Sequence, residues 1–271
     1  MSKPLCIYHG NCADGFGAAW AVWKAHPDWE FFPGVYQNDP PDCSGRDVYL
    51  VDFSYKRAVL ESIIDCAESV TIIDHHKTAA DDLADLIGPL ADGVFDMEHS
   101  GAMLAWQWFH GDAEPPQLLR HIEDRDLWKF ELPFTREIQA AVFSYPYDFA
   151  LWDALMNTDT KQLAAEGAAI ERKHFKDINE LLGVVTREFE IGGYRVKVAN
   201  LPYTLTSDAG HKLAEGNPFG GCYWDTPDGR VFSLRSTDDG IDVSEIAKQY
   251  GGGGHRNASG FRVPFDHPLA A

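Results

Sequence analysis

The sequence predicts an α/β protein in two parts, with an N-terminal parallel sheet joined by a long helix to a smaller α/β domain. Three observations support this prediction. Short apolar segments alternate with helical segments over the first half of the chain, and that alternation is typical of a parallel sheet. A long helical stretch follows, and beyond it paired strands with glycine turns take over. We place the domains at residues 1–160 and 188–271, with a helical linker at 161–187.

The first half of the chain carries three short apolar runs, which we interpret as strands. Between them lie segments with helical signals, such as small apolar residues or a serine able to cap a helix. Because strands and helices alternate here, a parallel sheet covered by helices is the expected result. The predicted elements, in order, are a strand at 5–8, a helix at 15–23, a strand at 48–51, a helix from the cap Ser54 to about Ala67, and a strand at 70–73.

The rest of the chain is first helical and then rich in strands. Helices are expected at 100–110, from 115 to 123, and from 147 to about 182 with a break at 157–160. Beyond them, Gly192–Gly193 and Pro227–Gly229 are turn sequences that predict two hairpins. A short helix near 243–249 and a final strand complete the predicted second domain.

Composition limits the kind of protein this is. The chain has 271 residues, of which 45% are hydrophobic and 24% charged, as is ordinary for a globular protein. No apolar run approaches the roughly 20 residues of a membrane span, and the first residues lack the apolar core of a signal peptide. The five cysteines are widely spaced without a C-x-x-C pair, which argues against a disulfide framework or a structural zinc site. We expect a cytoplasmic protein.

The chain is strongly acidic, with 23 basic against 42 acidic residues and a formal net charge of −19. Proteins that grip long duplexes usually present a basic stripe. If the substrate is a nucleic acid, we therefore expect a short piece held by a few local cations.

Polar side chains stand where each of the three predicted strands ends. The first strand is followed by His9, the second by Asp52, and the third by Asp74, His75 and His76. Because ligand sites in open parallel sheets form at the carboxyl edge, we expect these side chains to converge. Carboxylate and imidazole groups suit Mn²⁺, Fe²⁺ or Zn²⁺, and several of them can hold two ions about 3.5–4 Å apart.

Two of these aspartates have distinct expected roles. Asp52 ends the middle candidate strand and suits a carboxylate that bridges two ions. Asp74 has an alternative role, in which it orients a histidine through a hydrogen bond and touches no metal.

Ordered motifs along the chain resemble those of one family. The triplet "DHH" follows an apolar strand, "HGNCADGFGAAW" stands upstream, and "GGGGHRNASGF" lies near the C-terminus. Together they resemble the DHH phosphoesterases that carry a DHHA1 domain, whose relatives include RecJ-type exonucleases, oligoribonuclease/pAp-phosphatase proteins and cyclic-dinucleotide phosphodiesterases. The resemblance covers nearly the whole chain and implies a DHH domain joined by a long helix to a smaller DHHA1 domain.

The resemblance also implies a metal centre that holds two Mn²⁺ ions, with Mg²⁺ or another divalent ion as the alternative. His9 and Asp52 would bind the first ion, while Asp14, Asp52 and His75 would bind the second. A later aspartate would add a ligand, and we favour Asp124 over Asp126. His76 would lie near the attacking water or the substrate phosphate, so that His76, Asp52 and Asp74 are the expected catalytic residues.

The first motif departs from the family's usual pattern. Where the family has two aspartates flanking one residue before a glycine, this chain has "NCADG". Asp14 matches the second aspartate, and Cys12 stands in place of the first. The first ion would then use Cys12 as a thiolate, the neutral oxygen of Asn11, or a water molecule, and its affinity or metal preference would change.

The C-terminal motif predicts a substrate site. Backbone N–H groups in a run of glycines can approach an anion closely, and cationic side chains beside them add charge-assisted hydrogen bonds. In DHHA1 relatives this motif holds the terminal nucleotide and its phosphate. The expected substrate-binding residues are Arg235, Gly252, Gly253, Gly254, His255 and Arg256.

The expected function is metal-dependent hydrolysis of phosphodiester or terminal phosphate bonds in short oligonucleotides or nucleotides, by a water activated between two ions. The alternatives are a pAp phosphatase or cyclic-dinucleotide phosphodiesterase, a pyrophosphatase or polyphosphatase, and a non-catalytic nucleotide-binding protein with a degenerate metal site. The expected partner is a short nucleic acid or nucleotide, with no membrane, and a homodimer is left open. The tryptophans of "WQWF" are expected in the core, whereas Trp128 is left open as a base-stacking residue.

Overall fold

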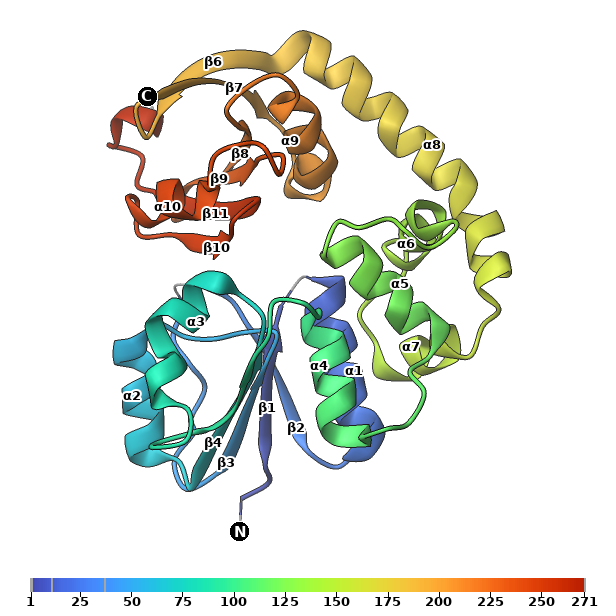
Figure 1. Cartoon of the computed structure of the whole chain (residues 1–271), viewed down its shortest axis with the longest axis vertical. Helices are drawn as coiled ribbons and strands as arrows, with labels where there is room; N and C mark the ends of the chain where they lie inside the picture. The colour runs from blue at the N-terminus through green and yellow to red at the C-terminus, as the bar shows by residue number, and fades with distance from the viewer. Residues whose placement is uncertain (1, 11, 37, 271) are drawn as a thin grey trace. The chain divides into compact units, whose positions relative to one another are not determined.

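The computed structural model describes residues 2–10, 12–36 and 38–270, and the chain divides into two compact units (Figure 1). The first unit comprises residues 1–171 and the second residues 172–271. The division falls inside α8 (Thr160–Val185), a helix of 26 residues. This helix occupies the range in which the sequence predicts the linker. Among the described residues, no helix combines the length and hydrophobicity needed to cross a membrane.

The first unit is built on a parallel sheet whose described strands run in the order β2-β1-β3-β4-β5. The three predicted strands are confirmed as its centre. The two outer strands were not predicted, because β2 contains a proline and is half exposed and β5 is short and lacks a buried residue. The bounds are β1 Leu5–His9, β2 Glu30–Gly34, β3 Asp47–Val51, β4 Ser69–Asp74 and β5 Asp92–Phe95.

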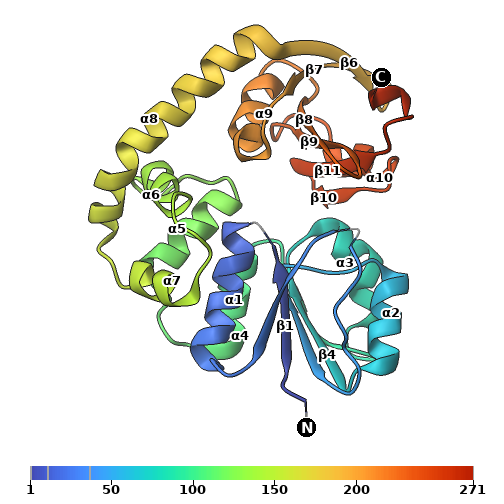
Figure 2. The same cartoon turned by 180° about the vertical axis from the view of Figure 1, so that it is seen from behind.

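Helices cover both faces of this sheet, as a parallel sheet requires. Figures 1 and 2 show α1 and α4 on one face and α2 and α3 on the other. Side chains along β1 therefore alternate between the two helical layers: Cys6 packs toward α1, while Leu5 and Ile7 pack toward α2. The helices of this unit are α1 Ala13–Ala25, α2 Arg57–Cys66, α3 Lys77–Leu83, α4 Gly101–His110, α5 Gln117–Asp126, α6 Thr135–Val142 and α7 Phe149–Met156.

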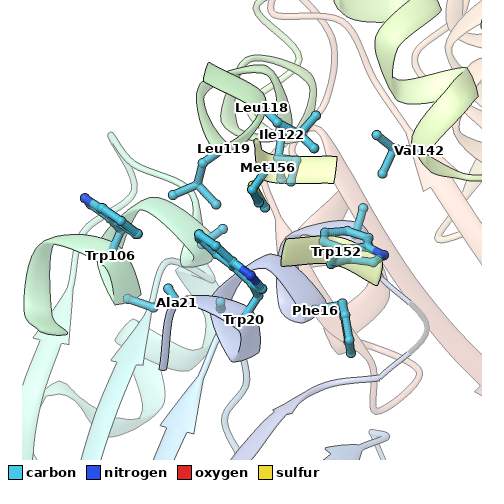
Figure 3. Packing of buried hydrophobic residues seen from close by; sticks show 14 of the residues in the cluster. Phe16, Trp20, Ala21, Trp106, Leu118, Leu119, Ile122, Val142, Trp152 and Met156 are labelled. Carbon is cyan, nitrogen blue, oxygen red and sulfur yellow. The ribbon is translucent and has the colours of Figure 1, made fainter. Parts of the chain in front are cut away.

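The larger core lies between α1, α4, α5 and α7, whose side chains gather in one cluster (Figure 3). Trp20 and Trp106 stack there with ring centroids 5.8 Å apart. The core position predicted for the tryptophans of "WQWF" is confirmed for Trp106 and wrong for Trp108, which is 40% exposed. The predicted cap of α2 is also wrong: the helix begins at Arg57, and Ser54 donates its hydroxyl to Asp74 instead.

The second unit holds a sheet whose described strands run in the order β10-β11-β9-β8-β7-β6. Both predicted hairpins are confirmed, because β6 and β7 pair across Gly192–Gly193 and β8 and β9 pair across Pro227–Asp228. β7 and β8 are parallel neighbours. The bounds are β6 Thr186–Ile191, β7 Tyr194–Asn200, α9 Thr206–Ala214, β8 Gly220–Thr226, β9 Gly229–Arg235, α10 Val243–Lys248, β10 Gly253–His255 and β11 Ala258–Val263.

Candidate metal centre

Polar side chains of the first unit meet at the carboxyl edge of its sheet. His9 ends β1, Asp52 follows β3, and Asp74 ends β4. Asp52 lies between the neighbouring histidines, with Oδ2 3.5 Å from His9 Nδ1 and Oδ1 3.1 Å from His75 Nε2. His75 Nε2 also lies 3.7 Å from Asp14 Oδ2. We call this cluster the candidate metal centre.

The backbone turns sharply at Asp52 to place its carboxylate. Asp52 has φ 53°, a left-handed conformation that a non-glycine residue rarely adopts, and its N–H donates to Ile73 O on β4 at 2.9 Å. The start of α4 packs on it so closely that a Cβ at Gly101 would lie 2.3 Å from the Asp52 Cβ. Asp52 is 1% exposed, and no described residue completes a hydrogen bond to its Oδ1.

Asp14 is held by the N-terminus of α4. Its carboxylate accepts hydrogen bonds from Gly101 N at 2.7 Å and Ala102 N at 3.2 Å. Asp14 itself sits in the first turn of α1, so two helix N-termini favour its negative charge. Oδ2 accepts the bond from Gly101 and Oδ1 the bond from Ala102, and Oδ2 also lies 3.7 Å from His75 Nε2.

Asp74 is a buried carboxylate whose two oxygens are already in use. Oδ1 lies 2.7 Å from His76 Nδ1 and accepts His75 N at 2.8 Å, and Oδ2 accepts Ser54 Oγ at 2.6 Å. This geometry fits the alternative role given to Asp74, in which it orients a histidine. The sequence predicted Ser54 as a helix cap and did not predict its hydrogen bond to Asp74.

The later aspartate of the cluster is Asp126, and the choice of Asp124 is corrected. Asp126 Oδ2 lies 3.5 Å from His75 Nε2. Asp124 instead binds the segment that follows α5. Its carboxylate accepts hydrogen bonds from Glu131 N at 2.8 Å, Leu132 N at 3.2 Å and Thr135 Oγ1 at 2.5 Å. With its oxygens committed to this segment, Asp124 is a structural residue.

Charge interactions in the cluster are strong because burial strengthens them. Burial disfavours the charged form of His9 and His75, yet the Asp52 carboxylate outweighs it and holds the pKa of both well above the ordinary value. Burial acts to raise the pKa of Asp52, but the same pairs hold it far below its usual range. Burial together with the carboxylates of Asp126 and Asp52 raises the pKa of Asp14. Divalent cations would replace the protons that this cluster holds.

The residues present fit bound cations. Among the described residues of the first unit, three sets each hold donor atoms that lie within 4.8 Å of one another: His9, Cys12 and Asp52; Asp14, His75 and Asp126; and Asp52, Asp74 and His76. Asp52 turns one oxygen toward each of the first two sets. Its buried Oδ1, which no described hydrogen bond satisfies, is the position that a cation would fill. Asn11, the other candidate beside Cys12, lies outside the described residues.

Aromatic and cationic side chains flank Asp126 in the sequence. Arg136 lies over the ring of Phe130 at 3.7 Å and over that of Trp128 at 5.6 Å, and Arg125 lies 5.7 Å from the Trp128 ring. Trp128 and Phe130 both have left-handed backbones, with φ 57° and 51°. Trp128 is therefore a half-buried member of a cation–π cluster rather than a core residue.

In the second unit, the predicted substrate residues gather at one end of the sheet. Ala258 pairs with Arg235 in β9, which places the turn between β10 and β11 beside that arginine. Arg235 donates to Ser207 Oγ and Ser233 Oγ, both at 2.9 Å, and Arg256 donates to Gly240 O at 3.0 Å.

The glycines of this turn also have a packing role. A Cβ at Gly252 would lie 2.1 Å from Gly260 O, and one at Gly254 would lie 2.6 Å from Ala258 O. Gly253 pairs with Gly260 in the β10–β11 ladder. The run of small residues is thus required by the close pairing of these two strands, whatever else it binds.

A parallel sheet with a histidine–aspartate cluster at its carboxyl edge, followed by a second α/β unit, defines a class of two-unit α/β proteins with a candidate metal centre on the first unit. No protein-family model matches the chain. Its fold is similar to that of the DHH domain of a protein described as a member of a family of ribosomal proteins, with 13% identity, a TM-score of 0.57, and coverage of 96% of this chain and 82% of that one. The chain therefore has the fold of the DHH-domain proteins, and the resemblance seen in its motifs is confirmed at the level of the fold.

Two further similarities were found. The uncharacterized protein R106 of Acanthamoeba polyphaga mimivirus is 34% identical over 286 residues, and the match covers 94% of this chain and 66% of the length of that protein. RecJ from Thermus thermophilus, in complex with Mn²⁺, is 15% identical, and the match covers 97% of this chain and 50% of that one. Its TM-score is 0.48.

Proposed function

We propose that the chain is a divalent-metal-dependent phosphoesterase that hydrolyses phosphodiester or terminal phosphate bonds of short oligonucleotides or nucleotides. The position of Asp52 is the observation that carries this proposal. Its two oxygens face different donor sets, at 3.5 Å from His9 and 3.1 Å from His75. A carboxylate in that position is suited to bridge two ions, as two-metal hydrolases require.

The residues of the cluster would have two kinds of role in hydrolysis, holding the ions and acting on the phosphoryl group. Bound ions would polarise the phosphoryl oxygens and lower the pKa of a water molecule toward neutrality. His9 and Asp52 would hold the first ion, and Asp14, Asp52, His75 and Asp126 the second, with Mn²⁺ favoured by the motif resemblance. His76, oriented by Asp74, would stabilise charge on the phosphoryl group or protonate the leaving oxygen.

Local cations make an acidic chain compatible with an anionic substrate. The net charge of −19 disfavours a long nucleic acid, whose affinity depends on many phosphate contacts. Arg125 and Arg136 on the first unit, and Arg235, His255 and Arg256 on the second, offer a few cationic contacts suited to a short substrate. We infer a nanoRNase-like or exonuclease-like activity in the cytoplasm.

Three alternative functions would use part of the same site. A pAp phosphatase or cyclic-dinucleotide phosphodiesterase would use the same centre on a different nucleotide. A pyrophosphatase or polyphosphatase is less favoured, because the segment at 251–261 resembles a nucleotide-associated domain. A non-catalytic nucleotide-binding protein would follow if Cys12 had ended metal binding at the first position.

A digest with end-labelled substrates tests the proposal. The protein, stripped with a chelator and then given Mn²⁺, Mg²⁺ or Co²⁺, is assayed on RNA of increasing length from the dinucleotide, on pAp and on a cyclic dinucleotide. Fast cleavage of the shortest RNA, fading with length, supports the proposal, whereas cleavage of only pAp or the cyclic compound changes the substrate. Asp52→Ala should abolish turnover in a folded protein, and the exposed Asp65→Ala on α2 serves as the matched control. Metal-dependent turnover retained by Asp52→Ala would contradict the bridging role.

A further inference from the structure

The first donor set contains a sulfur atom. Imidazole nitrogen from His9, the thiol of Cys12 and a carboxylate oxygen of Asp52 lie within 4.8 Å of one another. The second set, formed by Asp14, His75 and Asp126, offers two carboxylates and one imidazole. The two neighbouring positions thus differ in chemical character, one with mixed nitrogen, sulfur and oxygen donors and the other richer in oxygen.

The Cys12 thiol lies beside a buried carboxylate and an imidazole. Asp52, a member of the same donor set, is almost wholly buried, and its Oδ2 lies 3.5 Å from His9 Nδ1. A buried carboxylate beside an imidazole and a thiol is a donor set that a divalent cation can occupy. Cys12 is half exposed and lies directly before α1, so that its sulfur is accessible to an ion arriving from solvent.

The other cysteines are separated from this site. Cys6, Cys43 and Cys222 are buried in the described structure, and Cys66 is exposed at the end of α2, where its thiol donates to Ile63 O at 3.4 Å. Among the described residues, Cys12 is the cysteine that falls in a candidate metal group.

We propose that Cys12 is a thiolate ligand of the ion held by His9 and Asp52, and that it makes this position selective for Zn²⁺, Co²⁺ or Fe²⁺ over Mn²⁺ and Mg²⁺. Thiolate ligands favour the borderline and softer divalent ions, whereas oxygen-rich sets suit Mn²⁺ and Mg²⁺. The second position keeps the harder ion, so the loaded protein would hold two different metals. This inference rests on the proposed function only in using the same metal centre.

Cobalt reports directly on the sulfur ligand. The full-length protein is stripped with a chelator, dialysed against Co²⁺ and measured in two ways, by metal content and by near-ultraviolet absorption. A thiolate bound to Co²⁺ gives a sulfur-to-metal charge-transfer band that oxygen and nitrogen ligands do not give. We expect the band in the native protein and in Cys66→Ser, and its loss in Cys12→Ser.

Cys12→Asp is the second variant, because it keeps a charged ligand if the serine variant folds poorly. It should bind Co²⁺ without the band, and in competition dialysis its ratio of bound Zn²⁺ to bound Mn²⁺ should fall below that of the native protein. In the native protein, bound Co²⁺ without the band would overturn the role of Cys12 and leave the proposed function standing, as would a band that survives in Cys12→Ser. A native protein that binds no metal at all would refute both.

Discussion

Asp74 Oδ1 lies 2.7 Å from His76 Nδ1, while the other oxygen of the same carboxylate accepts the hydroxyl of Ser54 at 2.6 Å. Asp74 is wholly buried, and burial acts to raise its pKa, yet the His76 charge holds that pKa at about 2. The carboxylate is therefore ionised at neutral pH and orients the imidazole. In the proposed reaction it would act through His76.

Asp74→Asn should reduce kcat by about 10–100-fold, the usual effect of losing a partner that orients a histidine at a metal site. A neutral amide has only one acceptor oxygen, so it cannot accept hydrogen bonds from both Ser54 and His76. The His76 imidazole then loses the partner that fixes its tautomer. Bound metal per chain should stay unchanged when measured after dialysis. Ser54→Ala, which removes only the outer hydrogen bond, should show a smaller loss. A fall in metal content in Asp74→Asn would make Asp74 a ligand instead.

Asp126→Asn and Asp124→Asn form a matched pair two residues apart. Asp126→Asn should weaken metal binding, because it removes a charged donor from the set with Asp14 and His75. Asp124→Asn should leave the metal sites intact and destabilise the first unit by about 1–3 kcal/mol, since Asp124 accepts three hydrogen bonds from the segment that follows. Metal titration and denaturant unfolding separate the two effects. If Asp124→Asn weakens metal binding and Asp126→Asn does not, Asp124 is the ligand.

Gly101→Ala should disrupt the centre without touching a donor. The new Cβ would stand 2.3 Å from the Asp52 Cβ, so that α4 or the Asp52 turn must move. We expect lower metal affinity and a lower unfolding temperature. Gly183→Ala in α8 is the control, because nothing lies within 4 Å of its Cβ, and alanine there should be neutral or stabilising by up to about 1 kcal/mol. Normal metal binding by Gly101→Ala would show that Asp52 has room to shift.

The metal-free protein should lose stability as the pH rises above 6.5, the ordinary pKa of histidine. His9 and His75 have folded-state pKa values raised above that value, so the stability they contribute is complete below pH 6.5 and is lost as the pH passes the folded values. The loss can reach about 1.4 kcal/mol per pH unit for each histidine.

Other groups do not reverse this trend in the same window. Asp14 and Asp126 have raised folded-state pKa values, so their titration also lowers the stability of the protein as the pH rises. His121 has a pKa lowered from 6.5, and its contribution is complete above that pH. Unfolding in chelator at a series of pH values measures the decline, which should flatten with saturating metal. Constant stability across this range in chelator would contradict the charge pattern.

Arg235→Gln should raise KM with little change in kcat if Arg235 binds substrate phosphate. A hydrogen bond to a charged group contributes about 1.5–3 kcal/mol, or roughly ten- to a hundredfold in kcat/KM. Arg195→Gln is the control, since Arg195 forms an exposed pair with Glu188 in the same unit. An equal effect of the two variants would indicate a general loss of positive charge.

The sequence by itself determined the three central strands of the first sheet and the edge at which the candidate site lies. Three apolar runs ending in His9, Asp52 and Asp74 define parallel strands, and parallel strands bring their carboxyl ends to one edge. The hairpins of the second unit follow in the same way from Gly192–Gly193 and Pro227–Gly229, because such turns are local. These features depend on neighbours in sequence and on one general rule of sheet geometry.

Tertiary structure decided what local pattern leaves open. Asp124 and Asp126 stand two residues apart on α5, about 200° around the helix, so only the packing of α5 determines which one faces His75. The role of Ser54 also depends on a partner 20 residues away, and the edge strands β2 and β5 lack the buried pattern of the central ones. Long-range packing selects among side chains that are chemically alike, and a single chain's pattern does not contain that choice.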